Sequence, residues 1–578
     1  MDTISALSDR FVDGYAVLDP VRTSLVMGVA RNDTRLTDWS PDGIDAVGTF
    51  LRRTLDDLRR LTPLDDAERQ GADFLEDLAS GELGLIEAGE RERSMSPMTG
   101  PPSQIRFAFD LMERATPEGW ERIGMRLAAI PAALDGYVAS LRHGLAGGRV
   151  APRRLTLAVA EQCRTWAGTD GAATGGAFSQ FATEYGEGPL RARLAANGEL
   201  ADAAYDRLSE WLTREYAPVA LETDGVGDDC YRLWARSLLG TADLDLDEAY
   251  GWGIEELAWL EAEKRAECER VRPGASFAEV VEFLETDPAE SIDGIDAFRH
   301  WLQQLTDDVI AQLQGVEFDL PEVLRRCEVM TPVGEPGSGP YYTNPAEDLS
   351  TPAQVWFPTQ GATRFPRWGH VTTLYHEAVP GHHLEVASTR FTLLTRAQKL
   401  GMNSAHAEGW ALYAERLMDE LGWFTTPATR LGFLTMQAFR AARVIVDIGL
   451  HTGRAIPAGF FGAGFFGAGF FGAGLRGTGL PEADRPGAGQ PWTPELAITF
   501  MAGVGALTAA EAEHEVLRYL SWPSQAPCYK LGERAWLAAR DQAKARAGAS
   551  WNRKDWHTRA LGRGAMGLDR LVVDLAKL

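Results

Sequence analysis

Histidines and glutamates gather between residues 370 and 408 in a composition that suits a metal site. Five of the ten histidines of the chain fall there, at His370, His376, His382, His383 and His406, where uniform placement would put fewer than one. Imidazole nitrogens and carboxylate oxygens are ligands of Zn²⁺, so the cluster predicts metal binding. For any one of these histidines taken alone, an ordinary hydrogen-bonding role is the alternative.

The segment YHEAVPGHHLE, residues 375–385, resembles the zinc-protease pattern H-E-x-x-H with two extra residues. His376 begins it, and the next imidazoles follow six and seven positions later, at His382 and His383. In a straight helix, six residues rise about 9 Å and turn about 240°, and seven rise about 10.5 Å. Neither histidine could then share one Zn²⁺ with His376, because each Zn–N bond is only about 2.0–2.1 Å.

Pro380 and Gly381 interrupt this helix. Proline removes a backbone donor and disfavours the α conformation in the preceding Val379, and glycine tolerates the dihedral angles that follow. We therefore predict a bulge or break between Glu377 and His382 that brings the second imidazole back to the first.

Glu408 is the expected third ligand. It lies near the start of the helical pattern NSAHAEGWALYAERLMDELGW, residues 403–423, and 26 residues beyond His382. Two histidines and one glutamate, with a fourth position open to water, compose a catalytic zinc site. Glu377 would then be the general base for the attacking water. The alternative for Glu408 is a solvated carboxylate favoured by the helix dipole.

Amphipathic helices must position these residues. Apolar residues recur at intervals of three and four in 119–145, 203–220 and 298–316. Near 330 the chain becomes rich in Gly, Pro, Tyr and Thr, which predicts loops and short strands, and helical patterns return from about 366. We predict a mainly α protein with a small β-sheet near the metal helix, divided into a helical part at 1–330 and a catalytic part at 331–578.

The overall composition limits the partners and the compartment. Lys and Arg number 57 against 82 Asp and Glu, a net charge of −25 that argues against nucleic acid or an anionic membrane as partner. The five cysteines form no C-x-x-C pair, which predicts reduced thiols. The start lacks the pattern of a signal peptide, and no run of 18 apolar residues occurs. The expectation is a cytoplasmic enzyme.

Four segments together resemble the bacterial domain-of-unknown-function family 885: YHEAVPGHHLE, AHAEGWALYAERL, QAFRAARVIVDIGLHTG and SQAPCYKLGE. LAAIPAALDGYVASLRHGLAGGRVAPRRL extends the resemblance to nearly the whole chain. The family is regarded as zincin-like, related in its catalytic helices to thimet oligopeptidase and angiotensin-converting enzyme. The resemblance implies a multi-helical zincin-like metallopeptidase fold with a deep cleft, of which residues 1–330 would form one wall.

The resemblance also assigns roles to individual residues. His376 and Glu377 match the first ligand and the base. Gly381-His382 resembles the G-H that closes the motif in the better-known relatives, which selects His382 over His383. Glu408 is similar to the glutamate of the third-ligand helix. The Pro-Gly insertion separates the family from those peptidases, so the metal follows more directly than the peptidase activity.

A repeat of A-G-F-F-G at 458–475 falls inside a segment, 454–490, that looks like an insertion where "GLHTG" would otherwise run into the helix of "PWTPELAITFM". Its glycines disfavour helix and strand. A low-complexity surface loop is the favoured interpretation and a flexible lid the alternative.

Three further residues are candidates for contact with a substrate. The resemblance suggests that Tyr529 faces the site, where its hydroxyl would stabilise an oxyanion; local hydrogen bonding is the alternative. Tyr341, in GSGPYYTNP, would lie on an edge strand that pairs with an extended peptide or else in a plain loop. Arg443 would pair with Asp447, with a structural glutamate or with a carboxylate of the substrate.

These expectations combine into one function. We predict a hydrolase that uses one Zn²⁺ and Glu377 to cleave peptide bonds of short or unfolded peptides. Hydrolysis of another amide, or a non-catalytic binding protein of the same fold, are the alternatives. A pure scaffold has no need of a carboxylate beside the first ligand, so Glu377 favours an enzyme.

Overall fold

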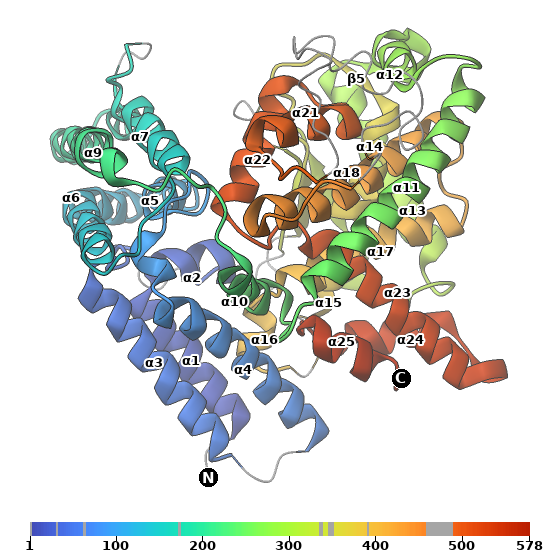
Figure 1. Cartoon of the computed structure of the whole chain (residues 1–578), viewed down its shortest axis with the longest axis horizontal. Helices are drawn as coiled ribbons and strands as arrows, with labels where there is room; N and C mark the ends of the chain where they lie inside the picture. The colour runs from blue at the N-terminus through green and yellow to red at the C-terminus, as the bar shows by residue number, and fades with distance from the viewer. Residues whose placement is uncertain are drawn as a thin grey trace. The chain divides into compact units, whose positions relative to one another are not determined.

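A computed structural model of the protein describes residues 3–29, 33–61, 65–171, 175–333, 339–344, 352–389, 392, 394–457, 460 and 489–578. The described chain is mainly helical, as predicted (Figure 1). Apart from Phe460, the Gly/Phe repeats lie outside the described residues, so their interpretation stays a prediction.

The first half of the chain holds helices α1 (Ile4–Leu18), α2 (Pro20–Met27), α3 (Pro41–Arg59), α4 (Asp66–Glu87), α5 (Pro101–Ala108), α6 (Pro117–Ala146), α7 (Arg153–Ala167), α8 (Ala177–Thr183), α9 (Arg191–Trp211), α10 (Asp228–Leu239), α11 (Leu246–Val271) and α12 (Phe277–Thr286). The second half holds α13 (Ile295–Leu313), α14 (Arg367–Glu377), α15 (His382–Thr389), α16 (Arg396–Leu400), α17 (Ser404–Glu420), α18 (Pro427–Thr452), α21 (Pro494–Gly505), α22 (Ala509–Ser521), α23 (Cys528–Ala547), α24 (Arg553–Leu561) and α25 (Leu568–Leu575).

The chain forms two compact units. The first comprises Met1–Ser237 with two later segments, Thr395–Met402 and Leu517–Pro523, and the second comprises Leu238–Leu394, Asn403–Val516 and Ser524–Leu578. The division expected at 330 therefore falls inside the second unit. The reason is that α11, well before 330, packs along α18, which lies after 330.

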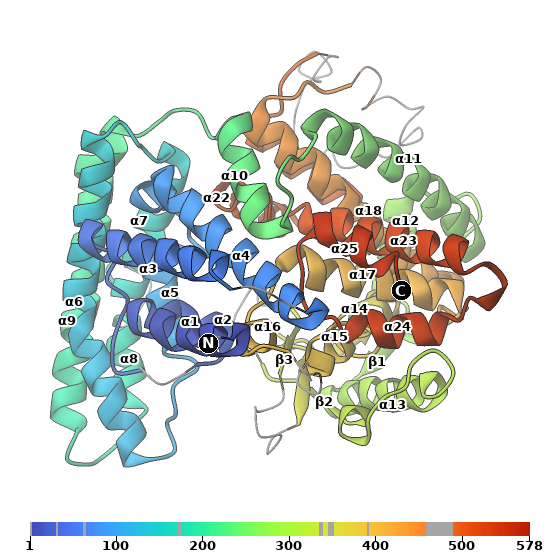
Figure 2. The same cartoon turned by 90° about the horizontal axis from the view of Figure 1, so that it is seen from below.

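Pairs of packed helices build the first unit. Helices α6 and α9 lie side by side (Figure 2), and α3 packs on α4. The N-terminus of α4 carries a capping box, in which Asp65 accepts from the Glu68 amide and Glu68 accepts from the Asp65 amide. Buried within this unit, the Glu82 carboxylate accepts hydrogen bonds from both Arg22 and Arg91, which compensates its charge.

The second unit holds five short strands in two small sheets. They are β1 (Ser291–Asp293), β2 (Cys327–Met330), β3 (Tyr341–Thr343), β4 (Ala353–Trp356) and β5 (Arg364–Pro366). Strand β4 pairs in parallel with β2 and antiparallel with β3, so β3 lies at the edge of that sheet among the described strands. Strand β5, paired antiparallel with β1, leads directly into α14.

An apolar cluster fixes the start of α14 against the sheets. Phe298 of α13 stacks on Phe365 of β5 with ring centroids 4.1 Å apart. Val329 and Val355, paired across β2 and β4, are buried in the same cluster, as is Leu374 of α14. Burial of this apolar surface holds α14 in place.

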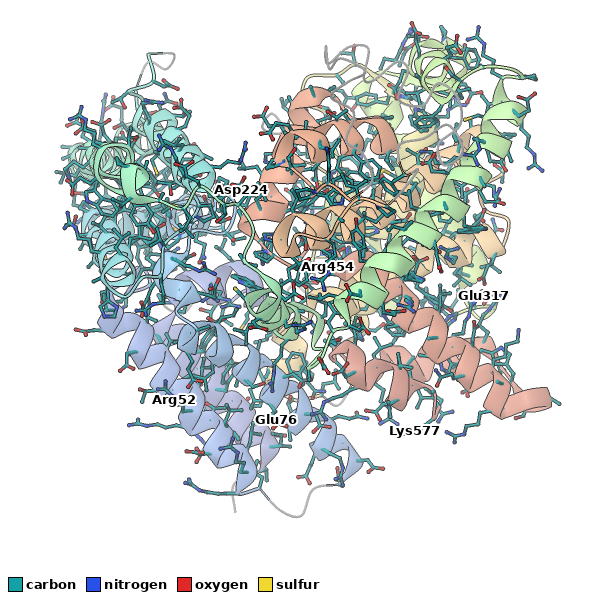
Figure 3. The ribbon with its side chains drawn as sticks, viewed as in Figure 1. Arg52, Glu76, Asp224, Glu317, Arg454 and Lys577 are labelled. Atoms are coloured by element: carbon teal, nitrogen blue, oxygen red, sulfur yellow. The ribbon has the colours of Figure 1, made fainter. Side chains whose placement is uncertain are left out.

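Charged side chains cover the outside of both units. Figure 3 shows Arg52 and Lys577 extending from the helices at the periphery, where their ion pairs with Glu87 and Asp574 are exposed and contribute little to stability. The five cysteines are all free thiols. Among the described residues, no helix has both the length and the apolar content needed to cross a membrane.

Candidate metal centre

The helix that carries His376 breaks where the sequence predicts. Helix α14 ends at Glu377, Ala378 leaves the helical region at φ −93° and ψ −123°, and α15 begins at His382. Close packing of the break requires Gly381, because a Cβ there would stand 1.9 Å from the His376 carbonyl oxygen. The chain thus folds back on itself between the two imidazoles.

Helix α17 holds this break in position. The indole Nε1 of Trp410, a fully buried residue, lies 2.8 Å from the Pro380 carbonyl oxygen and 3.2 Å from that of Gly381. Trp410 stands two residues after Glu408, and the Asn403 side chain caps α17 by accepting from the His406 amide. One helix therefore supplies the carboxylate and also fixes the loop that carries the second histidine.

His376, His382 and Glu408 converge on one point. Glu408 Oε2 lies 3.3 Å from His376 Nε2 and 3.5 Å from His382 Nε2, and one ligand atom of each residue lies within 4.8 Å of the others. Two ligands bonded at about 2.0–2.1 Å to one tetrahedral ion stand about 3.3–3.4 Å apart. The two histidines and the glutamate therefore fit a Zn²⁺ ion.

The burial and the ionisation of the Glu408 carboxylate favour the binding of a cation. Its Oε2 is buried, and apart from the imidazoles of His376 and His382 it has no hydrogen-bond partner among the described residues, a costly state for a charged oxygen. Burial alone would raise the pKa of Glu408, but the adjacent imidazoles of His376 and His382 hold it well below its ordinary value. Glu408 is consequently ionised and directed at the two histidines.

His376 also binds a second carboxylate, which the sequence did not reveal. Its Nδ1 lies 2.8 Å from Oε1 of Glu415, a fully buried residue whose Oε2 accepts from the Thr372 hydroxyl at 2.6 Å. The Gln437 amide nitrogen lies 3.5 Å from the same Oε2, and Arg440 lies 3.9 Å from Oε1. Such a carboxylate orients a metal-ligating imidazole and fixes its tautomer.

The two carboxylates set the protonation of His376. Burial would lower its pKa, but Glu408 and Glu415 raise the pKa of His376 to about 9. For Glu415, burial raises the pKa, and the charge of Arg440 together with the His376 bond brings it below the ordinary value. Spacing gives a signal for Glu415 in retrospect, since it follows Glu408 by seven residues and so shares one face of α17.

Glu377 is the residue expected to act as the general base. Its carboxyl is partly buried at the last residue of α14, next to His376 and near His382. Burial raises the pKa of Glu377, which the charges of the two histidines only partly offset. A raised pKa brings a carboxylate nearer to the operating range of a proton-transfer group at neutral pH.

The other three histidines of the cluster have different partners. The His383 Nε2 lies 2.9 Å from the Leu324 carbonyl oxygen and its Nδ1 lies 3.2 Å from the Tyr342 hydroxyl, so both ring nitrogens are bonded away from Glu408. His370 packs on Phe298 in the apolar cluster. His406 Nδ1 lies 3.1 Å from a carboxylate oxygen of Glu385.

Tyr529 lies beside the first histidine. It is the second residue of α23, and its buried ring stacks on the His376 ring with centroids 6.2 Å apart and planes 17° apart. Helices α17 and α23 approach closely because Gly409 and Gly532 meet, where a Cβ on Gly532 would stand 2.1 Å from the Ala405 carbonyl oxygen.

The structure gives Arg443 and Tyr341 other neighbours. Arg443 forms an ion pair with Glu515 at 2.9 Å and lies over the Tyr529 ring at 4.8 Å, so its carboxylate partner is a glutamate of the protein. Tyr341 is 45 % exposed on edge strand β3 and stacks on Trp356.

Comparisons with known proteins give a family and a fold. A family described as "Bacterial protein of unknown function (DUF885)" matches residues 22–574. No curated protein matches the sequence. A Colwellia psychrerythraea protein described as a "putative lipoprotein" has a similar crystal structure, with a TM-score of 0.81, 20% identity, and coverage of 100% of this chain and 99% of that chain. A Shewanella oneidensis protein described as a "putative lipoprotein of unknown function" has a TM-score of 0.72, 16% identity, and 99% coverage of each chain. At such identities the likeness establishes the fold alone.

Proposed function

The chain belongs to the bacterial family DUF885, whose function is unknown, and from its candidate metal centre we propose a zinc-dependent hydrolase that cleaves peptide bonds of short or unfolded peptides. The observation that carries the proposal is the convergence of His376, His382 and Glu408 across a broken helix. One residue each from α14, α15 and α17 places a ligand atom within 4.8 Å of the other two, close enough for all three to bind one ion. The proposal includes a zincin-like assignment of the fold, with a substrate cleft.

Each neighbouring residue has a role in this proposal. A Zn²⁺ ion bound by the three residues would act as a Lewis acid and lower the pKa of a water molecule. Glu377 takes the proton of the attacking water and passes it to the leaving amine, and the raised pKa of this carboxyl supports that role. Tyr529, stacked on His376, donates a hydrogen bond from its hydroxyl to the oxyanion that forms on the substrate.

Strand β3 supports a peptide as the substrate. It lies at the edge of its sheet among the described strands, so an extended peptide can add to it by backbone hydrogen bonds. Tyr342 of this strand contacts His383, the neighbour of the ligand His382. A strand tied in this way to the metal helix would hold a peptide next to Glu377.

The decisive experiment compares the wild type with Glu377→Gln, which removes the base and keeps the shape of the side chain. We expect one zinc per chain in both proteins and loss of at least 100-fold in the hydrolysis of a mixed peptide library, read by mass spectrometry. Full hydrolysis by the variant would contradict the assignment of the base. A metal-bound wild type that cleaves only other amides, or nothing, would favour one of the two alternative functions.

The compartment stays a prediction. The sequence predicts the cytoplasm, whereas the two similar solved structures are of proteins described as "putative lipoprotein". Fractionation of cells that express the full natural gene would distinguish a cytoplasmic enzyme from a membrane-anchored one.

A further inference from the structure

We infer that Lys530, acting through Gln437 and Glu415, is a positioning residue for the metal ligand His376. The inference rests on the metal centre proposed above and adds two residues that touch neither the ion nor the substrate. It follows from a chain of hydrogen bonds in which every donor and acceptor is determined by chemistry, and it begins at a lysine buried inside the second unit.

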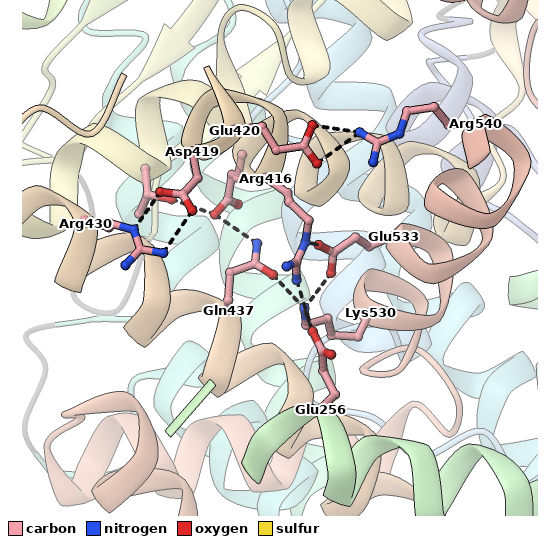
Figure 4. Close-up of polar contacts among 11 residues, drawn as sticks. Glu256, Arg416, Asp419, Glu420, Arg430, Gln437, Lys530, Glu533 and Arg540 are labelled. Carbon is pink, nitrogen blue, oxygen red and sulfur yellow. Dashed lines mark hydrogen bonds and ion pairs between the residues drawn. The ribbon is translucent and has the colours of Figure 1, made fainter. Parts of the chain in front are cut away.

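Lys530 is fully buried, and its ammonium has three acceptors (Figure 4). Its Nζ donates to Glu533 at 2.6 Å, to Glu256 at 2.8 Å and to the Gln437 side-chain oxygen at 2.7 Å. An ammonium has three protons and accepts nothing, so these three bonds use its whole capacity. The position of the ammonium is therefore fixed by residues of α11, α18 and α23.

The lysine determines how Gln437 is oriented. The two ends of a glutamine amide are distinguished by their hydrogen-bond partners, and the end that faces an ammonium must be the oxygen. The NH₂ group consequently points the other way, where it lies 3.5 Å from Glu415 Oε2. At 3.5 Å this hydrogen bond is long and weak, but the NH₂ group can only be its donor and the carboxylate oxygen only its acceptor.

Gln437 and Thr372 then determine how Glu415 serves His376. Both donate to Glu415 Oε2, which leaves Oε1 to accept the proton on His376 Nδ1 at 2.8 Å. Because Nδ1 keeps its proton in the bond to Glu415, Nε2, which faces Glu408, is the nitrogen that releases its proton to bind a metal. The sequence of bonds from Lys530 to His376 thus selects the imidazole tautomer that a metal requires.

The cluster around Lys530 adds no net charge. Lys530 therefore acts on the Glu415–His376 pair by orienting the Gln437 amide and not by its electrostatic field. Arg416 pairs with Glu533 and with Glu256, at 3.0 Å in the latter case, so two cations face two carboxylates (Figure 4). Replacing a buried ionic cluster by apolar residues is often neutral or stabilising, so stability alone does not account for it. Positioning of Gln437 is a role that an apolar residue could not fill.

The test measures zinc affinity by competition with a chelator, and the absorption spectrum of Co²⁺ in place of zinc, in the full chain. Gln437→Met breaks the link but keeps the ion cluster, and Lys530→Met removes its origin. We expect about tenfold weaker zinc binding for each and a shifted Co²⁺ spectrum, with Glu415→Gln weaker by about 10- to 100-fold. Circular dichroism establishes that each variant is folded.

Lys264→Met is the matched control. Lys264 is also a buried lysine of the second unit, 1% exposed, but its ammonium binds Glu261 and the Val504 carbonyl oxygen. We expect this variant to bind zinc like the wild type. If the Lys530→Met variant does not fold, the zinc affinity and Co²⁺ spectrum of Gln437→Met alone test the inference. Wild-type affinity and spectrum in folded Gln437→Met would overturn the inference while the metal centre stood, whereas a wild type without zinc affinity would overturn both.

Discussion

At the scale of single residues, two adjacent histidines have opposite environments. His382 directs Nε2 toward Glu408, whereas His383 is bonded through both ring nitrogens to Tyr342 and Leu324. We predict that His382→Ala lowers zinc affinity by at least 100-fold, because one of three protein ligands is lost. His383→Ala is expected to keep affinity within about tenfold and to lose about 1–3 kcal/mol of stability, because buried groups lose their partner.

Zinc content after dialysis and the thermal midpoint of each variant measure these two effects. Loss of zinc from His383→Ala with retention by His382→Ala would reverse the assignment.

Residue types and spacing sufficed to select His376, Glu377 and Glu408 as candidates. They did not reveal Glu415, because its seven-residue spacing from Glu408 indicates a shared helix face but not a contact with His376. They also did not reveal the ion pair of Arg443 with Glu515, which lies 72 residues away.

At the scale of elements, the site depends on the break between α14 and α15. We predict that Gly381→Ala weakens zinc binding by more than tenfold and costs about 1–3 kcal/mol, because the new Cβ would meet the backbone oxygens of His376 and Tyr375 at 1.9 and 2.4 Å. Zinc titration and thermal unfolding measure both quantities.

Gly369→Ala on the same helix is the control, since a Cβ there meets nothing within 4 Å. It should leave zinc binding unchanged and be neutral or stabilising by up to about 1 kcal/mol, because alanine favours a helix interior over glycine. Unaltered zinc affinity in Gly381→Ala would show that the tight turn is not what brings the imidazoles together.

Local patterns predicted these elements well where the periodicity was strong. The pattern at 119–145 corresponds to α6 at Pro117–Ala146, and that at 298–316 to α13 at Ile295–Leu313. The pattern at 203–220 ran past the end of α9 at Trp211, because the chain there continues as a π-helical turn at Leu212–Tyr216 and a 3₁₀ turn at Ala217–Val219. Proline and glycine predicted the break itself, and the packing of Trp410 that stabilises it is a tertiary contact without a local signal.

At the scale of the whole molecule, the mainly α class predicted from the sequence is confirmed, and the division at 330 into a helical part and a catalytic part stays a prediction. Composition changes near 330, yet helix α11 packs on α18, and the compact units divide between Ser237 and Leu238. Two short segments, at 395–402 and 517–523, belong to the first unit although the chain around them belongs to the second. The assignment of these two segments to the first unit depends on contacts between residues far apart in the sequence, which local sequence patterns do not predict.

The most direct test is anomalous X-ray diffraction at the zinc absorption edge, from crystals of the whole protein grown with zinc. We predict one strong peak within about 2.0–2.2 Å of His376 Nε2, His382 Nε2 and Glu408 Oε2. A map without a peak at these three atoms, or with the zinc on other residues, would contradict the account.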